Sequence, residues 1–174
     1  MVQMTVKYEI RVNIPEIRKV WALVEPNWDI IRKLSTDKGY VGLVPGVFDI
    51  LHPGHLEFLC WAKARCEYLI AALATDSSII ARKGSNPIYN FEQRAFMVAS
   101  TRYIDTVTQY TYGEILELLV ALKPNALIQG HNRISYIPDQ IRLYMAEERI
   151  EYIIHSRAGT LSTRILKEYI KNAS

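Results

Sequence analysis

The chain has 174 residues, of which 49% are hydrophobic and 22% are charged, a balance typical of one folded domain with a substantial core. Its formal net charge of +3 is too small for a protein that binds nucleic acid through a broad basic surface. No apolar run approaches the ~18 residues of a membrane helix, and the first residues carry charges where a signal peptide would be apolar. We therefore expect a cytoplasmic protein with no nucleic-acid or membrane partner. Cys60 and Cys66 match neither a disulfide framework nor a zinc site, so free thiols are predicted.

Residues 1–38 are interpreted as an N-terminal extension of unknown role, preceding a domain at residues 39–174. Within the extension, apolar residues alternate with polar ones as in a half-buried strand, at Val6, Tyr8, Ile10 and Val12. Two short helices are predicted after this strand, at Glu16–Leu23 and Asn27–Leu34.

After the extension, short apolar runs alternate with amphipathic segments. Strands are predicted at Tyr40–Val44, Tyr68–Ala74, Ile104–Thr108, Ala126–Ile128 and Glu151–Ile154. Helices are predicted at Leu56–Arg65, Phe91–Ser100, Glu114–Leu122, Asp139–Glu148 and Ser162–Lys171. Because parallel strands need crossover connections, the alternation predicts an α/β, Rossmann-like parallel sheet of about five strands with helices on both faces. Ligands of such sheets bind at the carboxyl ends of the strands.

The segment after the first core strand reads Gly-Val-Phe-Asp-Ile-Leu-His-Pro-Gly-His, from Gly46 to His55, and leads directly into a helix. A glycine and a helix start let phosphate oxygens approach backbone amides and the positive end of the helix. His52 and His55 can donate hydrogen bonds to a phosphorus centre as charge develops on it. The segment therefore predicts a phosphate site; the alternative is that His52 caps local backbone and His55 is an ordinary helix residue.

Two further segments carry cations beside predicted phosphate positions. Arg82 and Lys83 are expected on a loop after the second strand, where they would act as electrostatic clamps or form a solvated pair. Arg157 precedes a hydroxyl-rich helix start at which Ser162 is a plausible N-cap. Free amides at that start would bind phosphates, although capping without a ligand explains the same residues.

The Gly46–His55 segment resembles the GxFDxxHxGH signature of the cytidylyltransferase-like nucleotidyltransferases, and the resemblance extends over roughly Tyr40 to Tyr169. It is greatest to the glycerol-3-phosphate cytidylyltransferases and their choline-, ethanolamine- and heptose-phosphate relatives. The resemblance implies transfer of CMP from CTP to a polyol or sugar phosphate such as glycerol 3-phosphate, with release of pyrophosphate. It further implies Mg²⁺ bound with the triphosphate, and a homodimer. Two alternatives stay open: an adenylyltransferase of the heptose-phosphate or flavin-mononucleotide type, and a non-catalytic nucleotide sensor.

The resemblance also implies roles for individual residues. Those expected to act in catalysis are His52, His55 and Lys83. Those expected to bind the nucleotide are Gly46, Val47, Phe48, Arg102, Gly130, His131, Asn132, Arg157, Ser162 and Thr163. Those expected to bind the acceptor substrate are Asp49, Asp76 and Arg94, and no residue is expected to ligate a metal.

The stretch from Arg102 to Val107 is similar to the RYVDEV stretch of the cytidylyltransferases, which reaches the triphosphate and helps to build a dimer interface. This similarity favours CTP; alternatively, Arg102 only satisfies carbonyls at a helix end. His131 or Asn132 stands where relatives carry an aspartate that holds the base, a departure that leaves the base open.

Overall fold

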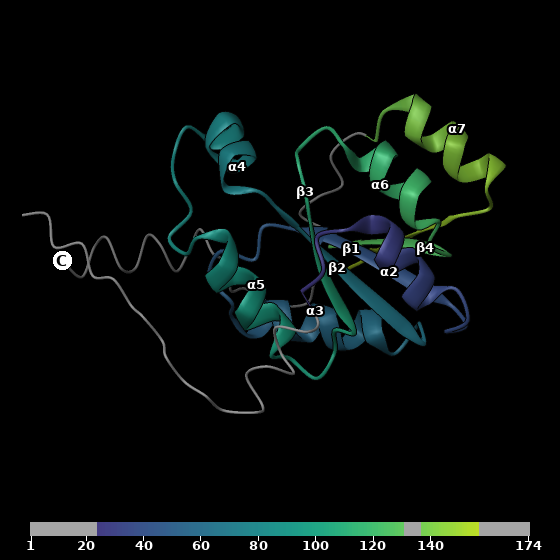
Figure 1. The fold of residues 1–174 in the computed structure, drawn as a ribbon, viewed down its shortest axis with the longest axis horizontal. Coiled ribbons are helices and arrows are strands. Elements are labelled where there is room, and N and C mark those ends of the chain that lie inside the picture. Colours follow the sequence, from purple (N-terminus) through teal and green to yellow (C-terminus); the bar gives the residue numbers. More distant parts are fainter. Residues whose placement is uncertain (1–23, 131–136, 157–174) are drawn as a thin grey trace, which may run out of the picture.

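The computed structural model describes residues 24–130 and 137–156, which build a five-stranded parallel sheet between two layers of helices (Figure 1). The strands are β1 (Val41–Gly46), β2 (Tyr68–Ala74), β3 (Thr106–Tyr110), β4 (Ala126–Gly130) and β5 (Glu151–His155). Their order across the sheet is β3-β2-β1-β4-β5, and each neighbouring pair is parallel. The predicted fold class is therefore confirmed.

The strands are continuous apolar runs because both faces of the sheet are covered. Along β2, Ile70 and Ala72 face one hydrophobic cluster, whereas Leu69, Ala71 and Leu73 face the other. The first cluster lies under α2 (Trp28–Ser35), α6 (Ile115–Leu122) and α7 (Asp139–Glu147). The second lies under α3 (Pro53–Lys63) and α5 (Phe91–Ala99).

One helix, α4 (Asp76–Lys83), replaces the loop that was predicted around Arg82 and Lys83. Asp76 lies in its first turn, where a negative charge is favourable. Gly84 ends the helix in the left-handed conformation, with φ of 70°, and donates its N–H to the carbonyl of Ile80. The loop prediction was wrong because the capping signals of this short helix were not recognised.

Part of the predicted N-terminal extension belongs to the sheet and its core. Val24 forms a parallel bridge with Val107 of β3, and the Trp28 indole donates to the carbonyl of Gln109 at 3.1 Å. Ile31 on α2 is fully buried in the first cluster. The predicted helix at 27–34 is thus confirmed, whereas the predicted strand at Val6–Val12 and the helix at Glu16–Leu23 lie outside the described residues.

Among the described helices, none combines the length and apolar character required to cross a bilayer. The predicted last helix, at Ser162–Lys171, also lies outside the described part of the chain.

Candidate active site

The site is centred on the loop that follows β1, next to the point where the strand order reverses. Crossovers lead from β1 toward β2 on one side, while β4 pairs with β1 on the other. Ligands of doubly wound sheets bind at this switch point, beyond the carboxyl ends of the strands. Gly46 ends β1 and Gly130 ends β4, so both predicted nucleotide-binding glycines lie at this edge. Among the described residues other than its chain neighbours, none has an atom within 4 Å of a Cβ placed at Gly130.

A tight turn at the end of β1 explains the requirement for glycine at position 46. Phe48 has a φ of 50°, which is rare for a residue with a side chain, and its buried ring folds back over Gly46. A Cβ at Gly46 would lie 2.3 Å from Cε2 of Phe48. The turn therefore places the backbone of Gly46, Val47 and Phe48 at the end of the strand, with the aromatic ring of Phe48 packed against Gly46.

His52 is the N-cap of α3, and its role as a cap fixes its ring. Its Nδ1 accepts a hydrogen bond from the backbone N–H of Gly54 at 3.1 Å, and Pro53 occupies the first helical position. In the neutral ring the proton is consequently on Nε2, which makes that atom a hydrogen-bond donor. His52 thus does cap local backbone, as the alternative interpretation held. The same cap orients Nε2, the atom that would donate a hydrogen bond to a phosphate.

His55 stacks against His52 in the first turn of α3. The two ring centroids are 3.9 Å apart with an interplanar angle of 32°, and Phe48 contacts His55 at a centroid distance of 5.3 Å. Two imidazoles this close repel each other when both are protonated, and a neighbouring anion relieves the repulsion. Together with the positive end of α3, the pair forms an arrangement suited to phosphate.

Asp49, predicted to bind substrate, is buried and contacts a distant segment of backbone. Its Oδ1 accepts hydrogen bonds from the N–H groups of Ile88 at 2.7 Å and Tyr89 at 3.1 Å. It therefore joins the loop after β1 to the connection between α4 and α5.

Arg94 and Asp76, the other predicted acceptor-binding residues, pair with each other at 2.5 Å. Arg94 is fully buried, and it also donates to the carbonyls of Val47, Ala74 and Tyr89 at 2.6, 2.8 and 3.0 Å. A direct contact between Arg94 and substrate would require the side chain to leave this enclosed position.

Lys83 is exposed and is the last residue of α4. Its neighbour Arg82 stacks its guanidinium over the ring of Tyr112, 4.5 Å from the centroid. Arg82 is thus held against an aromatic ring, while Lys83 is exposed in the last turn of the helix. The clamp expected of Lys83 stays a prediction.

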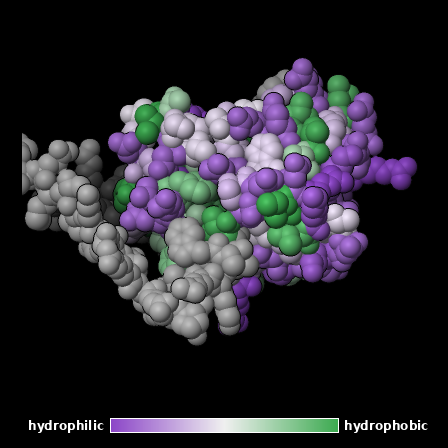
Figure 2. Space-filling model, viewed as in Figure 1, coloured by the Kyte–Doolittle hydropathy of each residue, from purple (hydrophilic) through white to green (hydrophobic). Residues whose placement is uncertain are grey.

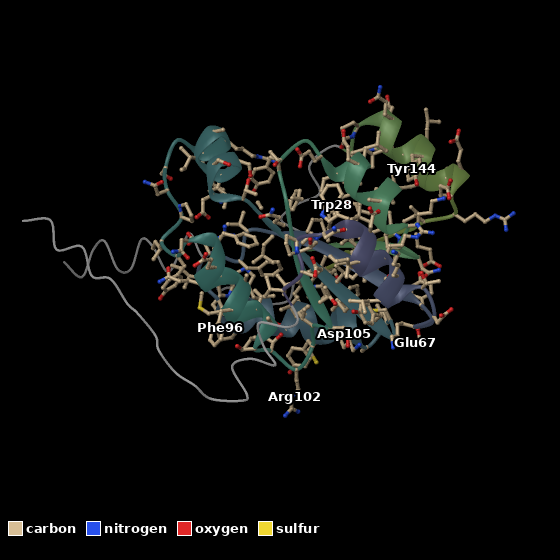
Figure 3. All side chains as sticks on the ribbon, viewed as in Figure 1. Trp28, Glu67, Phe96, Arg102, Asp105 and Tyr144 are labelled. Carbon is tan, nitrogen blue, oxygen red and sulfur yellow. The ribbon has the colours of Figure 1, made fainter. Side chains whose placement is uncertain are left out.

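Arg102 lies at the opposite edge of the sheet from the histidines. It belongs to the connection that enters β3, and nearby Asp105 donates its N–H to the carbonyl of Leu69, near the amino end of β2. Figure 3 shows Arg102 on the same edge as Asp105 and Glu67, pointing away from the body of the molecule. Within one chain, the structure does not bring Arg102 to the site.

The remaining predicted nucleotide-binding residues lie outside the described residues: His131, Asn132, Arg157, Ser162 and Thr163. A histidine that sequence reasoning did not select, His155, ends β5 beside Gly130 and packs against Phe58 and Trp61 of α3. The signal in the sequence that could have identified His155 is its position at the end of a predicted strand.

Within residues 24–130 and 137–156, no group of three metal-ligating side chains comes together. Asp49 in the loop after β1 and Asp76 at the start of α4 both accept hydrogen bonds from backbone N–H groups. The described residues therefore suit a Mg²⁺ ion that is held mainly by phosphate oxygens and water, as is usual for this ion.

Comparison with known families supports the family resemblance that the sequence predicts. A family model described as cytidylyltransferase-like matches residues 43–170. The chain belongs to this family. The predicted family resemblance is thus confirmed, and the match includes the Gly46–His55 loop.

Several curated proteins are similar to this member of the cytidylyltransferase-like family. The bifunctional protein HldE of Gluconacetobacter diazotrophicus is 39% identical over 58% of this chain and 20% of its own length. The FAD synthase of Pyrococcus abyssi is 45% identical over 51% of this chain and 60% of its own length. The matched part of the chain thus spans about a fifth of the HldE proteins.

Solved structures share the fold at low sequence identity. A lipopolysaccharide core biosynthesis protein from Thermoplasma volcanium superposes with a TM-score of 0.62 and 20% identity, over 70% of this chain and 99% of that one. Pantothenate synthetase from Thermus thermophilus gives a TM-score of 0.57 at 15% identity, over 86% of this chain and 70% of that one. Both likenesses concern the fold alone.

Proposed function

We propose that this chain transfers a nucleoside monophosphate from a nucleoside triphosphate to a phosphorylated small molecule, releasing pyrophosphate. The observation that carries the proposal is the stacked pair of His52 and His55 at the start of α3, beside the switch point of the sheet. An acceptor and a nucleotide that both carry phosphate match a site built from imidazole donors and a helix start.

In the proposed reaction, an oxygen of the acceptor phosphate attacks the α-phosphorus and forms the new P–O bond. The bond from that phosphorus to the bridging oxygen breaks, and its electron pair leaves with pyrophosphate. His52 and His55 donate hydrogen bonds to oxygens of the phosphorus centre, where negative charge increases. A Mg²⁺ ion bound with the triphosphate would supply further charge neutralisation. No covalent intermediate with the protein is required.

For the base, we propose adenine. FAD consists of flavin mononucleotide joined to AMP, so a FAD synthase relative at 45% identity supports adenylyl transfer. The residue that favoured CTP from the sequence, Arg102, lies at the amino edge of the sheet in this chain. This position weakens the argument for cytosine.

CTP with a polyol phosphate such as glycerol 3-phosphate is the second candidate. It is supported by the similarity of the Arg102–Val107 stretch to that of the cytidylyltransferases and by the description of the matching family. The dimer of that subgroup would be needed for Arg102 to reach a nucleotide.

The test is pyrophosphate release by the purified full chain with ATP or CTP, against flavin mononucleotide, glycerol 3-phosphate, phosphocholine and sugar phosphates. We expect release with ATP and one acceptor class. Release with CTP alone would establish the second candidate. Binding of triphosphate by calorimetry, with no release from any pair, would contradict catalysis and favour a nucleotide sensor.

A further inference from the structure

Two apolar side chains are exposed next to the candidate active site, in the connection between α4 and α5. Ile88 is 53% exposed and Tyr89 is 37% exposed. Figure 2 shows hydrophobic surface at α4 and at this connection, bordered by hydrophilic side chains. Isolated apolar residues are common on protein surfaces, so exposure alone implies nothing. This pair differs from other exposed apolar residues because its backbone is fixed by hydrogen bonds to buried groups.

The backbone under the pair is fixed by buried charged groups. The carboxylate of Asp49 accepts both N–H groups, at 2.7 Å from Ile88 and 3.1 Å from Tyr89. The carbonyl of Tyr89 accepts a hydrogen bond from Nε of Arg94 at 3.0 Å. Asp49 is 5% exposed and Arg94 is fully buried, so these bonds are shielded from water.

The next residue fixes the other side of the pair. Asn90 forms a capping box with Gln93 at the start of α5, in which each side chain accepts from the other residue's backbone N–H. The exposed pair is consequently presented by a backbone that is bonded on both sides. A backbone held in this way loses little further entropy when a ligand binds to the side chains that it carries.

The position of the pair suggests which part of a ligand it contacts. Asp49 belongs to the same loop as His52. Its carboxylate therefore connects the backbone of the exposed pair directly to the loop that carries the histidines. Phosphates are expected at the histidines and the start of α3. Ile88 and Tyr89 offer no charge to a phosphate and only one hydroxyl to a polyol, whereas an aromatic ring can stack on the tyrosine and contact the isoleucine.

We propose that Ile88 and Tyr89 bind the non-phosphate part of the acceptor, and that this part is a planar aromatic ring such as that of a flavin. The inference rests on the proposed function, because it assigns the body of the acceptor whose phosphate would be attacked. Asp49 is then a positioning residue that joins the acceptor-binding pair to the histidine loop.

The test uses flavin mononucleotide itself, whose ring fluorescence reports binding without any turnover. The full chain, Tyr89→Ala and Ile88→Ala are titrated with flavin mononucleotide, and ATP binding is measured separately by calorimetry. Tyr152→Ala is the matched control, because Tyr152 on β5 is also 37% exposed but lies toward the amino end of its strand. We expect Tyr89→Ala to weaken flavin binding by about tenfold, with the affinity for ATP and the control variant unchanged.

The outcomes separate this inference from the proposed function. Flavin binding that depends on Tyr89, without pyrophosphate release, would support the pair and contradict the transfer reaction. Pyrophosphate release with glycerol or sugar phosphates, and no binding of flavin mononucleotide, would overturn the inference and leave the transfer reaction intact. Flavin binding that is equal in Tyr89→Ala, Ile88→Ala and Tyr152→Ala would also overturn it.

Discussion

His52 and His55 occupy different environments although their rings are in contact. His52 is buried and fixed by its cap on Gly54, whereas His55 is half-buried against Phe48. The first ring therefore has a defined donor atom, and the second depends on its neighbours for its orientation. In the proposed reaction both rings donate to one phosphorus centre, so loss of either should be severe.

His55→Ala is expected to lower the rate of pyrophosphate release by about 10²–10³, the usual cost of removing one donor to a charged transition state. Folding should be retained, because His55 is not the residue that caps α3. Steady-state kinetics together with circular dichroism checks both statements. The control is Glu57→Ala, an exposed residue on the same helix, which should keep full activity. Undiminished turnover in His55→Ala would exclude the proposed site.

The two cysteines differ in reactivity for a reason that the structure supplies. Cys60 is exposed, whereas Cys66 is buried and donates its thiol to the carbonyl of Ala62. Burial raises the pKa of the Cys66 thiol, and the reactive form is the thiolate. At a given pH, a raised pKa leaves less thiolate, so Cys66 should be the slower to react.

A thiol-reactive dye at about pH 8 is thus expected to label one cysteine quickly in the folded chain and both cysteines after unfolding. Mass spectrometry of tryptic peptides identifies the labelled residue, which should be Cys60. A Cys60→Ser variant that is still labelled rapidly would show that Cys66 is accessible, contrary to its burial.

At the scale of elements, one arginine joins parts of the molecule that are distant in the sequence. Arg94 on α5 contacts Val47 in the loop after β1, Ala74 at the end of β2 and Asp76 at the start of α4. Removing it leaves a carboxylate and several carbonyls without their buried donor. Such a loss costs more than the net contribution of the intact pair.

Arg94→Leu is expected to lower the free energy of unfolding by about 3–5 kcal/mol. Urea unfolding followed by tryptophan fluorescence measures this change. Arg65→Leu serves as the control, because Arg65 is exposed and its guanidinium stacks on Trp61, 3.6 Å from the ring centroid, at the surface. A similar small change in both variants would contradict the role assigned to Arg94.

Helix α2 offers a matched pair of isoleucines with opposite environments. Ile31 is fully buried under the sheet, while its neighbour Ile30 is 43% exposed. Ile31→Ala should destabilise the protein by about 2–5 kcal/mol, and Ile30→Ala should have little effect. Thermal unfolding of both variants tests whether this part of the predicted extension belongs to the core. Equal midpoints would show that α2 contributes no packing.

At the scale of the whole molecule, the site lies at one edge of the sheet and Arg102 at the other. A contact between Arg102 and a nucleotide therefore needs a second copy of the chain. The homodimer expected from the family resemblance would supply it, and complementation between two inactive variants can detect it.

The second candidate, with its homodimer, predicts that Arg102→Ala and His55→Ala are each weakly active alone, and that an equimolar mixture regains about a quarter of wild-type activity. The reason is that half of all dimers in the mixture contain one chain of each type, and one of the two sites in each of these dimers has both residues intact. Activity of the mixture is measured after unfolding and refolding together. An Arg102→Ala variant with normal kinetics would instead show that Arg102 acts in no site.

The sequence alone determined the alternation of strands and helices, and with it the α/β class, because apolar periodicity is local and survives in any tertiary arrangement. It also located the histidine loop, since ligands of parallel sheets bind after their strands. The helix α4 was missed because a single short helix depends on its caps more than on periodicity.

Only the tertiary structure decided how the polar residues are used. The pairing of Asp49 with the backbone of Ile88 and Tyr89, about 40 residues away, follows from strand order and not from any local pattern. The enclosure of Arg94 depends on four segments that meet beneath the site. The position of Arg102 follows from the direction of β3, because a parallel strand is entered at the edge opposite to the one at which ligands bind.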